Sequence, residues 1–184
     1  MNSQSEEDYL KALYHLEMDF NAVSTNSIAD YLDMKPSSVT DMLKKLSEKK
    51  FINYQKYKGT SLTKKGKLIA LSIIRKHRLW ETFLVEKLGF GWDQVHTIAE
   101  QLEHIKSEEL IENLDNFLGN PKYDPHGDPI PNKDGDIEKM NQKILVELKA
   151  SQKGIITGVK KGTASLLNYL DKEKVKLGDS VKVI

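Results

Sequence analysis

The stretch TNSIADYLDMKPSSVTDMLKKLSE, residues 25–48, decides how the first part of this chain folds. It predicts a short helix over about residues 25–32, a tight turn, and a second helix from Pro36, because proline suits the first turn of a helix. The second helix has one apolar face, made of Val39, Met42, Leu43 and Leu46. Such a face packs against a core and leaves the other side of the helix exposed. The stretch is therefore predicted to be a helix-turn-helix.

The segments on either side complete a larger unit. An amphipathic helix is expected from Ser5 to about Asn21, where Ser5 and Asp8 have the spacing of a capping box. Residues 51–63 alternate around a bend near Gly59 and predict a small hairpin. A helix-turn-helix followed by a hairpin is a winged helix, whose second helix enters the major groove of DNA. Residues 1–63 are thus predicted to be a winged helix-turn-helix DNA-binding domain.

The distribution of charge supports this prediction, although the formal net charge of the 184 residues is only +1. Residues 35–78 hold 13 Lys and Arg against Asp41 and Glu48, a net charge of +11. The rest of the chain holds 15 basic and 25 acidic residues, a net charge of −10. A basic segment beside a winged helix favours a nucleic-acid partner. We expect five lysines to contact DNA phosphates: Lys35, Lys44, Lys45, Lys56 and Lys58. We expect three hydroxyl side chains to contact base edges: Ser37, Ser38 and Thr40.

The remainder of the chain is predicted to be a helical region followed by a small module with strands. Helices are expected over about residues 64–88, 92–106 and 107–118, and residues 120–136, which contain four of the five prolines, are expected to be a loop. Residues 64–136 thus form a second domain, and residues 137–184 a linker and a β-rich module. Only 32 residues follow Gln152, fewer than the roughly 40 that an independent domain needs. We therefore expect this module to be truncated or to pack on the rest of the protein.

The composition excludes several classes of protein. The chain has no cysteine, so disulfides, thiolate nucleophiles and cysteine-bound zinc are excluded, and any metal must be held by His, Asp and Glu. The apolar runs are too short to span a membrane, and the N-terminal MNSQSEEDYL is too polar for a secretory signal. We expect a cytoplasmic protein with no membrane partner.

Imidazoles and carboxylates recur at helical spacing in the second domain. Four side chains of the helix over residues 92–106 fall within a stripe of roughly 100°: His96, Glu100, Glu103 and His104. His77 and Glu81 repeat the i, i+4 spacing on the preceding helix. This donor set suits Mn²⁺, Fe²⁺ or Zn²⁺. A solvated helix face has the same pattern, so the spacing alone leaves both interpretations open.

Three further residues of these types have competing interpretations. Asp8 could be a metal ligand or could simply cap its own helix together with Ser5. His15 and His126 are expected to be surface or loop residues rather than ligands.

Six motifs, in order along the chain, resemble the metal-dependent transcriptional repressors of the diphtheria-toxin-repressor and manganese-transport-regulator family. They are EDYLKALYHL, KPSSVTDMLKKL, YQKYKGTSLTKKG, RKHRLWE, VHTIAEQLEH and DPHGDPIP. The resemblance covers most of the chain and implies a mainly α fold. Its parts are an N-terminal winged helix-turn-helix, a helical metal-binding and dimerisation domain, and a partial C-terminal SH3-like, FeoA-like β module. It also implies that metal couples the first two domains, so that a homodimer fits a palindromic operator.

Carried over residue by residue, the resemblance implies two metal sites. The primary site would be formed by Asp8, Glu100, Glu103 and His104, and the secondary site by His77, Glu81 and His96 with Asp124 as a further ligand. Iron-responsive members have Met in place of Asp8 and Cys in place of Glu100. Oxygen donors at both positions match the manganese-responsive members and suit a hard cation. Lys11 stands where members with a two-ion cluster have Glu, which favours separate sites.

The sequence thus predicts a Mn²⁺-activated homodimeric repressor that binds double-stranded operator DNA and controls metal-uptake genes. It is not expected to be an enzyme or to bind a small organic ligand. An Fe²⁺-dependent repressor with the same ligands is the alternative within this class. Two alternatives come from other classes: a helical-bundle metalloenzyme, and a winged-helix protein that does not depend on metal.

Overall fold

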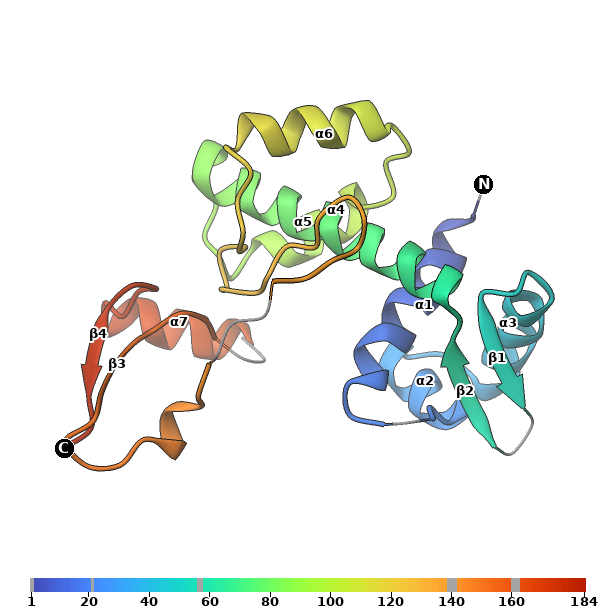
Figure 1. Cartoon of the computed structure of the whole chain (residues 1–184), viewed down its shortest axis with the longest axis horizontal. Coiled ribbons are helices and arrows are strands. Elements are labelled where there is room, and N and C mark those ends of the chain that lie inside the picture. Colours follow the sequence, from blue (N-terminus) through green and yellow to red (C-terminus); the bar gives the residue numbers. More distant parts are fainter. Residues whose placement is uncertain (1, 21, 56–57, 139–141, 160–162) are drawn as a thin grey trace. The chain divides into compact units, whose positions relative to one another are not determined.

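Helix α4, Lys64–Leu88, belongs to both of the units into which the chain folds (Figure 1). The structure is a computed structural model that describes residues 2–184 apart from 21, 56–57, 139–141 and 160–162. Unit 1 consists of Met1–Ile74 and Lys133–Gly135, and unit 2 of Arg75–Asn132 and Asp136–Ile184. Helices dominate the described residues and the strands form two small antiparallel pairs, which confirms the mainly α fold. The predicted boundaries at 63/64 and 136/137 stay a prediction.

Unit 1 contains the winged helix. Helices α1 (Gln4–Glu17), α2 (Thr25–Leu32) and α3 (Pro36–Glu48) precede strands β1 (Ile52–Gln55) and β2 (Gly59–Leu62). The strands pair antiparallel with Ile52 opposite Leu62, and Val23 forms an isolated bridge with Thr60. The predicted helix-turn-helix and hairpin are confirmed.

The apolar stripe of α3 packs into the core of unit 1. Val39, Leu43 and Leu46 are fully buried and belong to one cluster with Leu13 of α1 and Ile28 of α2. Full burial of such a side chain is worth about 1.5–3 kcal/mol. These contacts fix the orientation of α3 and turn its polar face away from the core.

The N-terminus of α1 differs from the prediction. Ser3 is the N-cap: its Oγ accepts the Glu6 N–H at 3.3 Å, and the Glu6 carboxylate accepts the Ser3 N–H at 3.0 Å. The predicted capping box of Ser5 and Asp8 is therefore wrong, because the longer Glu side chain closes the box one half-turn earlier. The helix also ends at Glu17 rather than near Asn21. Asp8 lies inside α1 and is not its cap.

Asp33 makes the turn between α2 and α3 in the left-handed region. Its φ is 51° and its ψ is 49°, and its N–H bonds back to the Ala29 carbonyl. Asp tolerates this conformation better than other side chains apart from Asn and Gly, whereas a β-branched residue is strained there. The turn sets the angle between the two helices.

We expect Asp33→Val to destabilise unit 1 by about 1–2 kcal/mol, because valine is strained at positive φ. Asp33→Gly should leave the stability nearly unchanged. Urea unfolding followed by circular dichroism measures both, with Asp30→Val on α2 as the control for removing an exposed carboxylate. Equal stability of the valine and glycine variants would show that the turn does not require this conformation.

Unit 2 is built on the second half of α4. Helices α5 (Val95–Leu102) and α6 (Glu108–Phe117) follow, and Leu79 of α4 packs with Ile111, Leu114 and Ile130. Helix α5 is shorter than the predicted 92–106, because Ser107 caps α6 and the preceding residues form the turn into it. Glu103 is consequently the C-cap of α5, and His104 lies beyond the helix.

The C-terminal part of unit 2 is a small module with two strands. A 3₁₀ turn, η1 (Leu145–Glu147), precedes β3 (Lys153–Ile155), α7 (Ala164–Lys172) and β4 (Ser180–Lys182). β3 and β4 pair antiparallel. The β-containing module is thus present, and its assignment as SH3-like stays a prediction.

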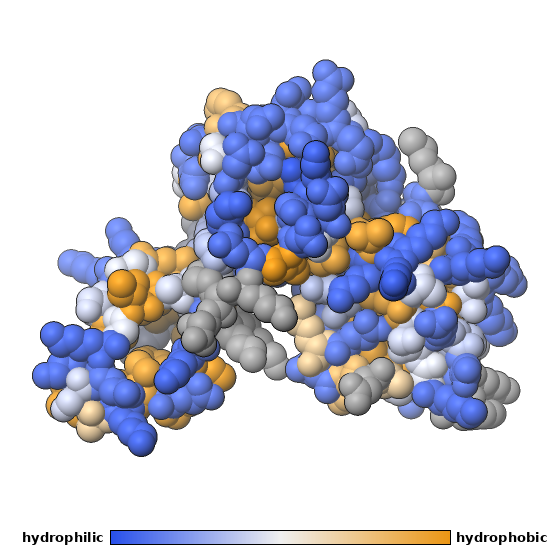
Figure 2. All heavy atoms as spheres, viewed as in Figure 1, coloured by the Kyte–Doolittle hydropathy of each residue, from blue (hydrophilic) through white to orange (hydrophobic). Residues whose placement is uncertain are grey.

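The surface carries scattered apolar side chains. Figure 2 shows such residues on the C-terminal module, where Val146, Ile155 and Tyr169 are more than half exposed. Within the described part of the chain, none of the helices has the length and apolar character needed to cross a membrane.

Candidate metal centre and nucleic-acid interface

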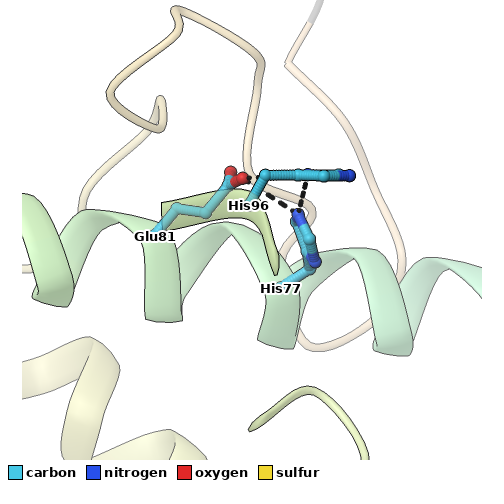
Figure 3. A group of neighbouring side chains, drawn as sticks. All are labelled: His77, Glu81 and His96. Atoms are coloured by element: carbon cyan, nitrogen blue, oxygen red, sulfur yellow. Dashed lines mark hydrogen bonds and ion pairs between the residues drawn. The ribbon is translucent and has the colours of Figure 1, made fainter. Parts of the chain in front are cut away.

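His77 contacts three other polar side chains in unit 2, of which two are buried. Its Nδ1 lies 2.6 Å from Glu103 Oε2, and its Nε2 lies 3.0 Å from Glu81 Oε1 and 3.1 Å from His96 Nδ1. His77 and Glu81 stand one turn apart on α4, and His96 reaches them from α5 (Figure 3). The structure therefore brings together His77, Glu81 and His96, three of the four residues expected at the secondary site.

The electrostatics of this cluster favour a cation. Burial alone would lower the pKa of His77, but hydrogen bonds to Glu103 and Glu81 raise it to about 9. Burial would raise the pKa of Glu81, yet hydrogen bonds from His126, His77 and His96 hold it well below its usual range. Buried carboxylates kept ionised in this way need positive charge close by. Imidazolium supplies that charge here, and a divalent ion bound by the same atoms would replace its proton.

A second group shares Glu81 and includes a residue that the sequence analysis set aside. Candidate ligand atoms of Glu81, Asp124 and His126 lie within 4.8 Å of one another. His126 Nδ1 is 3.6 Å from Glu81 Oε2, while its Nε2 lies 2.8 Å from the Trp92 carbonyl oxygen. Because a carbonyl can only accept, Nε2 is the donor to Trp92. Burial alone would lower the pKa of His126, but its hydrogen bond to Glu81 raises it to about 9, so Nδ1 also carries a proton directed at Glu81, which a bound ion would replace.

The loop that holds Asp124 and His126 is fixed by backbone hydrogen bonds. Asp124 Oδ1 accepts the N–H groups of His126 at 2.8 Å and Asp128 at 2.9 Å. Burial raises the pKa of Asp124 to about 6, and the negative charges of Glu81 and Asp128 add to this effect. The other oxygen, Oδ2, lies 3.7 Å from Arg78 Nε.

His126 lies in a loop, in line with the expectation of a surface or loop residue, but its side chain is only 13% exposed. The signal in the sequence was its position two residues after Asp124 within DPHGDPIP, which lets one short loop direct both side chains to the same place. Nothing in that loop predicted which helix it would pack against.

The residues expected at the primary site lie in both units. Glu103 is 0% exposed, with its Oε1 3.9 Å from His104 Nε2, and Glu100 Oε1 lies 3.4 Å from His96 Nε2. These three residues belong to unit 2, whereas Asp8 is on α1 of unit 1. The imidazole nitrogens and carboxylate oxygens of both sets suit Mn²⁺, Fe²⁺ or Zn²⁺. The composition of the primary set stays a prediction.

Residues expected to contact DNA lie on the exposed side of the winged helix. Lys35, Ser37 and Ser38 are exposed at the start of α3, and Lys35 makes no side-chain capping hydrogen bond. Lys58 is exposed in the hairpin, while Lys56 lies outside the described residues. Short hydroxyl side chains at the first turn of a recognition helix can reach base edges.

Two other expected contacts are engaged within α3 itself. Thr40 Oγ1 donates to the Pro36 carbonyl oxygen at 2.9 Å, so its hydroxyl proton is committed to the helix. Lys44 Nζ lies 3.1 Å from Asp41 Oδ1, and both side chains are largely exposed. An exposed pair of this kind is weak, which leaves Lys44 able to exchange its partner for a phosphate.

Comparison with known proteins shows a consistent family. The model of the iron-dependent repressor N-terminal DNA-binding domain matches residues 1–60, and that of the iron-dependent repressor metal-binding and dimerisation domain matches residues 63–132. The transcriptional regulator MntR of Oceanobacillus iheyensis is 35% identical over 124 residues, which are 67% of this chain and 84% of MntR. The iron-dependent repressor IdeR of Mycobacterium tuberculosis is 34% identical over 125 residues, 68% of this chain. The match spans about half of IdeR, 54% of its length.

A solved structure extends this similarity to nearly the whole chain. A manganese-dependent transcriptional repressor in complex with manganese has a TM-score of 0.86 at 32% identity, over 96% of this chain and 82% of that one. This chain belongs to the family of iron- and manganese-dependent transcriptional repressors. The resemblance seen in the sequence motifs is thereby confirmed.

We expect His126→Ala to weaken Mn²⁺ binding at the group of Glu81, Asp124 and His126 by about tenfold or more, since one ligand nitrogen is lost. Equilibrium dialysis with Mn²⁺ measures the number and affinity of bound ions. His15→Ala, in unit 1, is the control for loss of an imidazole. Unchanged stoichiometry and affinity in the His126 variant would contradict a metal-binding role for this residue.

Proposed function

We propose that this chain is a Mn²⁺-activated homodimeric transcriptional repressor that binds a palindromic operator and controls metal-uptake genes in the cytoplasm. The observation that carries the proposal is the presence of two features in one chain. A winged helix exposes Lys35, Ser37 and Ser38, and a second unit buries imidazoles around Glu81 and Glu103. Membership in a family of metal-dependent repressors supports the same conclusion.

The primary site in this proposal uses Asp8, Glu100, Glu103 and His104. A divalent ion there supplies positive charge that three carboxylates can share. Asp8 comes from unit 1 and the other three ligands come from unit 2. An ion held by residues from both units would restrain the units in one arrangement. A palindromic operator with a fixed spacing of its half-sites favours a dimer whose DNA-binding domains have one arrangement.

The secondary site in this proposal is centred on Glu81. His77 and His96 lie 3.0 and 3.4 Å from Glu81 Oε1, and His126 lies 3.6 Å from Oε2. Asp124 belongs to the same group as Glu81 and His126. Since one carboxylate belongs to both groups, the two groups cannot bind ions independently. Glu103 holds the His77 Nδ1–H, so this proposed primary ligand also orients a proposed secondary ligand.

Manganese is favoured over iron by the donor types. Asp8 and Glu100 are hard oxygen ligands at positions where iron-responsive members have sulfur, and hard ligands favour Mn²⁺. The relatives are named for both metals, IdeR for iron and the solved repressor for manganese. Fe²⁺ binds unselective sites more tightly than Mn²⁺, so titrating DNA binding with each metal under anaerobic conditions separates the two effectors.

We expect Mn²⁺ to raise the affinity for duplex DNA, and Glu103→Gln to abolish most of this increase. The amide keeps the volume of the side chain and can still accept the His77 N–H, but it lacks the charge that binds the ion. The DNA probe is the duplex that the parent protein with Mn²⁺ selects from a random-sequence pool. Fluorescence anisotropy then gives the dissociation constant with Mn²⁺ and with chelator.

Glu109→Gln on α6 is the matched control, because it removes one exposed carboxylate from unit 2. It should keep the full response to Mn²⁺. If the Glu103 variant without metal bound DNA as tightly as the parent with metal, or kept the parent's response, the switch would not lie at Glu103. If Mn²⁺ did not change the affinity of the parent protein for DNA, the result would instead favour a winged-helix protein that does not depend on metal.

A further inference from the structure

One carboxylate on α1 holds two lysines of the recognition helix α3. Glu6 Oε1 lies 2.6 Å from Lys49 Nζ and 3.0 Å from Lys45 Nζ. Glu6 Oε2 accepts the Ser3 N–H at 3.0 Å. The Glu6 side chain is only 1% exposed, whereas Lys45 and Lys49 are 52% and 37% exposed, so the carboxylate is shielded from water while its two partners lie at the surface.

The link adds polar contacts to the apolar packing between α1 and α3, in which Leu13 of α1 shares a buried cluster with Leu43 and Leu46 of α3. Glu6 joins the first turn of α1 to the C-terminal end of α3, where Lys45 and Lys49 stand one turn apart on the same face. Loss of both lysines would leave the buried Glu6 carboxylate without a charged partner, which is costly. The position of the first turn of α1 is therefore tied to α3.

Glu6 and Asp8 point to different sides of α1. Two residues along an α-helix correspond to a rotation of about 200°, which places Asp8 on the side opposite Glu6. One side of the first turn is thus fixed to the recognition helix, and the other side carries the carboxylate proposed as a metal ligand. A rigid helical turn between the two transmits any displacement of one to the other.

We propose that Glu6 is a positioning residue that transmits the metal-dependent position of α1 to the recognition helix through Lys45 and Lys49. This inference rests on the proposed function, because it takes Asp8 as a ligand of the activating ion. It also assigns the two lysines a second role. While Glu6 holds them, their charges are directed to α1 and are less available to DNA phosphates.

The test compares Glu6→Gln with Glu48→Gln. Gln is accepted at the third position of a capping box, so the first variant keeps the cap and removes the charge that holds the lysines. Glu48 is an exposed carboxylate on α3 itself, so its variant makes the same change in net charge and leaves the Glu6 contacts intact. Each full-length variant is titrated with the duplex selected by the parent protein, with saturating Mn²⁺ and with chelator. The readout is the metal response, the dissociation constant for DNA in chelator divided by that in Mn²⁺.

We expect Glu6→Gln to reduce this ratio by about tenfold, because the coupling between the metal and α3 is lost. Its affinity for DNA in chelator should rise above that of Glu48→Gln, because two freed lysines reach phosphates. Mn²⁺ affinity of the DNA-free protein, measured by dialysis, should stay within about twofold of the parent, since Glu6 is not a ligand. A purely structural role would instead lower DNA affinity by the same factor with and without metal.

A second variant approaches the link from α3. Lys45→Gln combined with Lys49→Gln keeps the Ser3–Glu6 cap and changes two side chains that are 52% and 37% exposed, so it tests the link even if Glu6→Gln unfolds. It too should reduce the ratio. A ratio equal to that of the parent in the folded variants overturns the inference and leaves the proposed function intact. If the parent protein binds DNA equally well with Mn²⁺ and with chelator, both the inference and the proposed function are overturned.

Discussion

His77 makes a hydrogen bond to a carboxylate at each of its ring nitrogens, and one of these bonds joins α4 to the end of α5. Nδ1 meets Glu103 at the end of α5, and Nε2 meets Glu81 one turn further along α4. All three side chains are nearly or fully buried. Removing one member would leave a buried charge without its partner, at a cost of several kcal/mol. The relative position of the candidate ligands on the two helices depends on this contact.

The net charge of +1 conceals a division of the basic residues into two roles. Arg75, Lys76 and Arg78, at the end of the basic segment, pair with acidic groups of unit 2. Lys45 and Lys49 pair with Glu6 in unit 1. Part of the basic segment therefore stabilises the fold. Lys35 at the start of α3 and Lys58 in the hairpin are exposed and are proposed to contact DNA phosphates.

The sequence predicted elements well where a local signal was unambiguous. Pro36 at the first turn and the apolar stripe after it place α3 correctly, because both the start and the buried face are encoded within one segment. Ser3 with Glu6 and Ser5 with Asp8 both have the spacing of a capping box, so local spacing did not determine which serine caps α1. The end of α5 depends on where Ser107 caps the next helix. The prediction that Glu103 and His104 lie on one continuous helix was therefore wrong.

The candidate site was predicted in part for the same reason. His77 and Glu81 follow helical spacing, the family resemblance grouped them with His96, and the three side chains meet in the structure. His126 has no periodic neighbour, and its burial depends on how a loop with three prolines packs against α4 and Trp92. Contacts between segments distant in sequence decide such a residue, and periodicity carries no information about them.

In the proposed mechanism, metal binding and DNA binding favour the same state of the protein. Reciprocity requires that DNA then raise the affinity for metal by the same factor by which metal raises the affinity for DNA. The direct measurement is equilibrium dialysis of Mn²⁺ against the full-length protein with and without saturating selected duplex. We expect tighter Mn²⁺ binding in the presence of the duplex. Equal Mn²⁺ affinity in both conditions would contradict it.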